Sequence, residues 1–168
     1  MALGEVKTDI HEVVEQVESS QEFQAFNSKN PHHYLVHAFC AAEAKPGAVE
    51  IGYYGKETDR ITVFKTNPVA AMPEEEVFKK EGHLEPLDLT AVRLGVKEAV
   101  ARAEQERAAA YPRHSAVKTI CVLQQQGNPV WNLTLVTATL QMIIMRIDAM
   151  SGQVLSKDMH SVMSIVKE

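Results

Sequence analysis

The residue types best suited to chemistry in this chain are its seven histidines and two cysteines. His33 and His37 are four residues apart in an extended segment, which would hold them about 13 Å from one another, too far to share one metal ion. His114 repeats His33 later in the chain and could meet it across a pseudo-twofold interface. Neither has a cysteine or carboxylate at ligand spacing beside it. The sequence therefore predicts no metal site and no cofactor.

Cys40 and Cys121 could act as nucleophiles only with a neighbouring base and an exposed, electropositive setting. Both lie instead in apolar segments that alternate with a period of two. This pattern favours buried thiols in a reducing compartment. The chain also lacks a Gly-x-Ser-x-Gly elbow, a His-Glu-x-x-His helix and a phosphate-binding glycine-rich loop. We therefore predict no catalytic residues and a protein that is not an enzyme.

An internal repeat organises the rest of the sequence. The block PHHYLVHAFC, which starts at Pro31, returns as PRHSAVKTIC, which starts at Pro112, with four identities at a constant offset of 81 residues. The same offset places the apolar run at 61–64 on the apolar run at 142–145 without a gap. A duplicated unit is therefore predicted.

Each unit begins with a helix and continues with strands. Apolar residues recur at helical spacing over residues 9–26 and 89–110, with a candidate capping residue before each. Pro31 and Pro112 end these helices, and the period then changes to two. The fold class predicted is α+β, with two similar helix-strand-strand-strand halves whose antiparallel sheets are each covered by a helix. The boundaries are 1–68 for the first half, 69–87 for a linker with a short helix near 73–80, and 88–168 for the second half.

Composition and charge exclude several classes of protein. The net charge of -5 is spread along the chain, and no basic block exceeds two residues, so no nucleic-acid partner is expected. No signal peptide and no apolar run long enough for a membrane helix is visible, so no membrane association is expected. A cytoplasmic location is the prediction that follows.

Bulky side chains occur on both faces of several predicted strands, although one helix covers only one face. The second faces should therefore pack against the sheet of the other half or of a second copy, and a homodimer is expected. Tyr53, Tyr54 and Trp131 are the candidate binding residues, because aromatic side chains with a polar tip are enriched at interfaces. Packing in the core explains at least one of these aromatic side chains equally well.

The stretch from Gly127 to Leu155 adds a family resemblance. An aromatic strand is followed by a strand that ends in Asp148, Ala149, Gly152 and Val154, where Ser151 replaces the threonine of the usual pattern. This hairpin resembles that of PepSY-type modules, and the first half resembles them more weakly. The resemblance implies a PepSY/cystatin-like fold and a non-catalytic binding or inhibitory role, with many members exported or membrane-attached.

Two functions remain open on this basis. The first is a non-enzymatic binding or regulatory protein that uses its sheet surfaces to hold a peptide, a protein or a copy of itself. The alternative is a small enzyme or ligand carrier with a pocket between the two halves, which converging His33, His114 and carboxylates would favour.

Overall fold

The computed structural model describes residues 6–42, 47–76 and 84–163. Its helices are α1 (Asp9–Glu18), α2 (Gln21–Lys29), the 3-10 turn η1 (Leu89–Ala91) and α3 (Val96–Ala110). Its strands are β1 (Tyr34–Ala42), β2 (Glu50–Gly55), β3 (Arg60–Lys65), β4 (Ala70–Ala71), β5 (Glu75–Glu76), β6 (Ala116–Gln126), β7 (Asn128–Thr137), β8 (Gln141–Asp148) and β9 (Val154–Ser161). The α+β class predicted from the sequence is confirmed.

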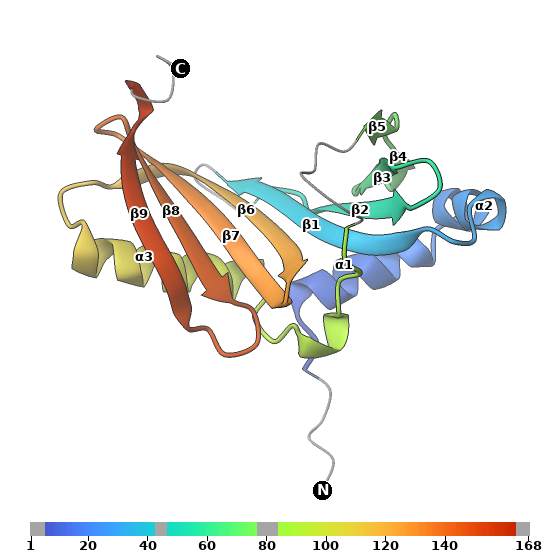
Figure 1. Cartoon of the computed structure of the whole chain (residues 1–168), viewed down its shortest axis with the longest axis horizontal. Helices are drawn as coiled ribbons and strands as arrows, with labels where there is room; N and C mark the ends of the chain where they lie inside the picture. The colour runs from blue at the N-terminus through green and yellow to red at the C-terminus, as the bar shows by residue number, and fades with distance from the viewer. Residues whose placement is uncertain (1–5, 43–46, 77–83, 164–168) are drawn as a thin grey trace, which may run out of the picture.

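All these strands belong to one antiparallel sheet with the order β4-β3-β2-β1-β6-β7-β8-β9, and β5 also pairs with β3. The two halves meet edge to edge at β1 and β6, where Cys40 lies opposite Cys121. Figure 1 shows α1 beneath the first half and α3 beneath the second, on the same side of the sheet, with α2 at the outer end of the first half. We call the helix-lined side the covered face and the other side the open face. The expected packing of the sheet of one half against the sheet of the other is therefore wrong, because hydrogen bonds between β1 and β6 join the halves side by side. Packing against a second copy of the chain stays a prediction.

The duplication extends to backbone details 81 residues apart. β1 has a register shift between Leu35 and His37, and β6 has one between Ala116 and Lys118. The helices α2 and α3 both end at a residue with φ -133° and ψ close to 60°. The link before β3 and the link before β8 each contain one residue with positive φ, Asp59 and Leu140. The same turns thus recur although their side chains differ.

The two predicted helices are shorter than their apolar periodicity indicated. The first is interrupted after α1, where Ser20 accepts a hydrogen bond from the Phe23 N–H and starts α2 as an N-cap. Thr8 caps α1 in the same way through the Ile10 N–H. The second predicted helix is divided into η1 and α3, and the carboxylate of Asp9 in the first half accepts the Val96 N–H at the start of α3. This bond of 2.9 Å ties the helix starts of the two halves together.

The core lies between the helices and the covered face. Ile10, Val14 and Val17 of α1 and Val96, Ala99 and Ala103 of α3 supply the helical side. Phe23 packs with the rings of Tyr53 and Phe64 at centroid distances of 4.9 and 5.6 Å. The core is one continuous cluster that spans both halves, so the halves share their interior as well as their sheet.

The sequence also predicts a short helix in the linker and a hairpin near the end of the chain. In the described part of the predicted 73–80 helix, residues 75–76 form β5 rather than a helix, and 77–83 lie outside the described residues. The hairpin between β8 and β9 is confirmed. The Asp148 carboxylate accepts the Met150 and Ser151 N–H groups at 2.8 and 2.9 Å, and Gly152 has φ +79°.

Candidate functional site

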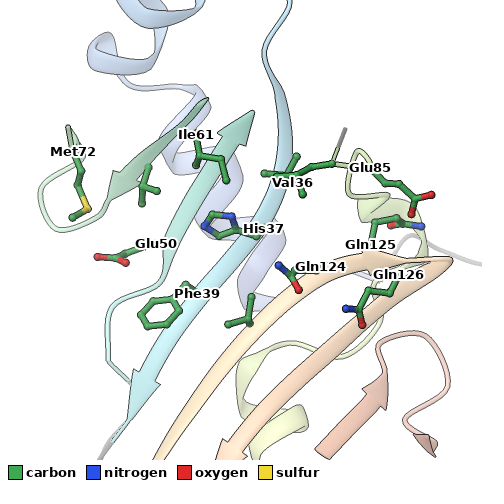
Figure 2. Close-up of a pocket in the computed structure, with 13 residues that line it drawn as sticks. Val36, His37, Phe39, Glu50, Ile61, Met72, Glu85, Gln124, Gln125 and Gln126 are labelled. Atoms are coloured by element: carbon green, nitrogen blue, oxygen red, sulfur yellow. The ribbon is translucent and has the colours of Figure 1, made fainter. Parts of the chain in front are cut away.

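A groove of about 550 Å³ lies on the open face, where the first half meets the second. Its size is within the usual range for small-molecule sites. β1, β2, β3 and β6 form its floor, and the segment at 84–85 forms part of its rim. The described lining consists of Val36, His37, Phe39, Glu50, Ile61, Val63, Met72, Leu84, Glu85, Val122, Gln124, Gln125 and Gln126, most of which Figure 2 labels.

The floor of the groove depends on one close contact between β1 and β2. His37 lies opposite Gly52 in the register of these strands. A Cβ atom on Gly52 would stand 2.1 Å from His37 Cε1 and 2.6 Å from each ring nitrogen. The imidazole therefore lies against the Gly52 backbone, in space that any other residue would fill. Figure 2 shows this ring at the centre of the groove, between Glu50 on one side and Gln124 on the other.

The bulge in β1 makes this arrangement possible. The irregularity between Leu35 and His37 lets Val36 and His37 both line the groove, although adjacent strand residues normally point to opposite faces. It also separates His37 from His33. The His33 ring lies on the covered face beside Phe26, at a centroid distance of 5.1 Å. His33 and His37 therefore lie on opposite faces of the sheet, although they are only four residues apart in the chain.

The electrostatics of the groove are set by acidic and neutral groups. Burial lowers the pKa of His37 below its ordinary value, which leaves the ring neutral at pH 7. Glu50 is half-buried and Glu85 is exposed, and the described lining contains no lysine or arginine. Arg146 is not part of this lining but contacts it, since its guanidinium donates to Gln126 Oε1 at 3.2 Å.

Amide side chains border the groove on the β6 side. Gln124 lies opposite His37 in the β1–β6 register. Gln125 is held by two hydrogen bonds, since its Oε1 accepts the Asp88 N–H at 3.0 Å and its Nε2 donates to the Gly127 carbonyl at 2.8 Å. The rim thus offers amide groups next to the apolar surface of Val122 and Phe39.

The structure places the three aromatic candidates from the sequence in the interior. Tyr53 and Trp131 lie on the covered face, where Tyr53 donates to Glu18 Oε1 at 3.2 Å and Trp131 Nε1 donates to the Leu94 carbonyl at 2.9 Å. Tyr54 points to the other face but is fully buried, and its hydroxyl donates to Asp59. Their polar tips are satisfied within the chain, so none of the three offers a free surface for a partner.

His33 and His114 do not converge. His114 Nδ1 forms a 2.6 Å hydrogen bond with Thr139 Oγ1 in the second half, whereas His33 lies against Gly55 and Phe26 in the first. Within the described residues no group of three or more metal-ligating side chains occurs. Both cysteines are buried, and burial raises the pKa of Cys121 to about 12.

Sequence reasoning did not identify His37 and Gly52 as a pair. Their contact depends on strand register and on the β1 bulge, and neither is visible in a period-two pattern. The signal available was a glycine inside a strand next to two tyrosines, since such a glycine often marks a close approach of another group.

The similarity of the chain to known proteins is limited to its fold. No family model matches it, and no curated protein sequence matches it either. One solved structure, described as "a putative lipoprotein" from Clostridium difficile 630, is similar with a TM-score of 0.55 and 13% sequence identity. The alignment covers 82% of this chain and 89% of the other. At this identity the likeness shows the fold alone. Among the described residues, no helix has the length and apolar character required to span a membrane.

Proposed function

We propose that the protein is a non-catalytic binding protein that holds a small molecule, or a short segment of a polypeptide, in the groove on the open face of its sheet. The observation that carries this proposal is the groove itself, in which apolar side chains surround a few polar groups at the junction of the halves. This combination is typical of ligand sites, where apolar surface supplies affinity and polar groups fix orientation.

The lining favours binding over catalysis. The described lining has no serine, cysteine, threonine or lysine that could act as a nucleophile beside His37. His37 could accept a proton, yet the residues that were expected to join it in an enzyme, His33 and His114, lie elsewhere. The position of the groove between the halves agrees with the alternative of a ligand carrier.

A pair of tryptophan variants tests the proposal. Gln124→Trp fills the groove, and Thr134→Trp places the same ring on the open face of the second half, outside the lining. We expect a fluorescent apolar probe such as anilinonaphthalene sulfonate to bind the original protein and Thr134→Trp, and to bind Gln124→Trp at least tenfold more weakly. Equal binding by all three proteins would contradict the proposal.

Native mass spectrometry of protein prepared from its own source gives an independent test. Retention of a small molecule or peptide in the original protein and its loss in Gln124→Trp supports the groove as the site. The same spectra report the oligomeric state, and a monomer at micromolar concentration would contradict the expected homodimer.

A further inference from the structure

The charged side chains in the described lining of the groove are all acidic, and this restricts the kind of ligand that the groove can bind. Glu50 and Glu85 are the charged groups of the described lining, and neither has a hydrogen bond or ion pair with another described residue. Other surface charges are used within the chain, as when Arg60 pairs with Glu74 at 3.9 Å and Lys157 with Glu106 at 2.5 Å. The groove thus presents carboxylates without a partner among the described side chains.

An aromatic ring stands beside one of these carboxylates. Phe39 of β1 lies directly opposite Glu50 of β2 in the strand register, so their side chains share the open face. Figure 2 shows the Phe39 ring next to Glu50 on the floor of the groove. The face of an aromatic ring attracts a cation through its quadrupole, and a carboxylate beside it adds charge attraction.

The remaining walls suit an apolar body. Ile61, Val63 and Met72 lie on the Glu50 side of the groove, and all three are half-buried, so a ligand there would displace water from apolar surface. His37 brings no positive charge at neutral pH, because burial lowers its pKa. Within the described lining, a bound anion would therefore meet carboxylates and no lysine or arginine, whereas a cation beside Glu50 would meet a carboxylate and an aromatic face.

We infer that the groove binds an organic cation, with an ammonium or guanidinium group between Glu50 and Phe39 and an apolar body along Ile61, Val63 and Met72. This inference rests on the proposed function and specifies its ligand. The cation is either a free amine or the side chain of a lysine or arginine in a polypeptide, and the two sources share the same chemistry at the groove.

Matched probes of equal length test the inference. Hexylamine, hexanol and hexanoate are each titrated into the ¹⁵N-labelled full chain at neutral pH, and the amide shifts of His37, Glu50 and Gln124 are followed. We expect hexylamine to bind about fivefold more tightly than hexanol, since one partly exposed ion pair contributes about this factor. Hexanoate should bind more weakly than hexanol.

Three variants assign the effect to its residues. Glu50→Gln should remove the preference for the amine over the alcohol, while Glu57→Gln, in the exposed turn after β2, should retain it. Phe39→Leu keeps an apolar side chain and should weaken amine binding while leaving hexanol binding unchanged. Each variant is first compared with the original protein by its amide spectrum, so that loss of the fold is distinguished from loss of the site.

The outcomes separate the inference from the proposed function. Tighter binding of hexanoate than of hexylamine, or an amine preference that survives Glu50→Gln, would overturn the organic cation and leave a binding groove. Absence of shifts with all three probes would contradict both. A capped Leu-Lys-Leu peptide that binds at least tenfold more tightly than hexylamine, and than its Leu-Glu-Leu counterpart, would support the polypeptide source, and equal affinity with hexylamine would support a free amine.

Discussion

In both halves the chain passes from a helix into a strand along the same backbone path, but the side chains that stabilise this junction differ in polarity. In the first half, Phe26 of α2 packs its ring against His33, at the end of a cluster with Phe23, Tyr53 and Phe64. In the second half the residue 81 positions later is Arg107. Its guanidinium donates to the Tyr111 and His114 carbonyl oxygens at 3.2 and 3.1 Å. The junction between helix and strand is therefore stabilised by apolar contacts in the first half and by hydrogen bonds in the second.

The open face shows a second difference between the halves. His37 of β1 lies opposite Gly52, whereas Lys118, 81 positions after His37, lies opposite Val136 of β7. A ring can lie against the backbone only where the partner has no side chain. The groove consequently forms where β1 passes β2 and has no equivalent at β6 and β7. The two halves thus share turns and register shifts of the backbone, whereas the side chains that do not determine these features differ.

The largest effect that tests this comparison is expected at Arg107. Its side chain is 9% exposed and also pairs with Glu104 at 2.6 Å. Arg107→Met keeps the apolar stem but removes every donor, so the free energy of unfolding should fall by about 3 kcal/mol, as measured by urea denaturation. Arg113→Met, at an exposed arginine just beyond α3, should change it by less than about 0.5 kcal/mol. Equal losses of unfolding free energy in the two variants would show that the hydrogen bonds of Arg107 at the helix-strand junction do not stabilise the second half.

A smaller effect is expected at Gly52. The added methyl group of Gly52→Ala would meet His37 Cε1 at 2.1 Å, so the ring must leave the groove floor. We expect a loss of about 1–2 kcal/mol in unfolding free energy and weaker probe binding in the groove. In a double-mutant cycle, His37→Ala should recover part of the loss caused by Gly52→Ala, because the clash is then removed. Strict additivity of the two changes would rule out the contact as the cause.

The smallest effect is a pH dependence. Burial lowers the pKa of His37 in the folded chain below its ordinary value of 6.5, so the unfolded chain binds the proton more readily. This contribution to stability is complete above about pH 6.5 and decreases as the pH falls toward the folded pKa. His37→Asn should therefore make the unfolding free energy less dependent on pH below 6.5, as followed by urea denaturation at several pH values. Burial also lowers the pKa of His33, so His33→Asn should act in the same direction, and the double variant more strongly. An unchanged pH profile in His37→Asn would argue against this origin.

Much of the fold follows from local patterns in the sequence. The repeat offset of 81 residues, the strand periods after Pro31 and Pro112, and the turn at Asp148 all depend on neighbouring residues, and the structure contains each of them. Helix length was predicted less well, because Ser20 offers a cap that competes with continuation of the helix. The pairing of halves was predicted wrongly for a related reason. Bulk on both faces of a strand indicates burial but does not indicate whether a neighbour joins at the face or at the edge.

The candidate site was harder to predict than the fold. Tyr53, Tyr54 and Trp131 were chosen for amphipathic side chains, and the structure satisfies their polar tips with Glu18, Asp59 and Leu94 inside the chain. The groove depends on Gly52 meeting His37 across a strand pair, which is a property of register. Periodicity specifies the face of a residue but not its partner on the next strand.

The pairing of β1 with β6 also constrains the order in which the molecule can fold. The hairpins within each half close short loops, whereas Cys40 and Cys121 are brought together across 81 positions of chain. Closing so long a loop costs chain entropy before any contact between the halves is gained. The first half emerges from the ribosome with β1 as an unpaired edge, and it must wait for β6 to be synthesised before that edge is protected from other chains. Among the described strand pairs, the central seam thus closes the longest loop, and it is the place where premature association has to be avoided.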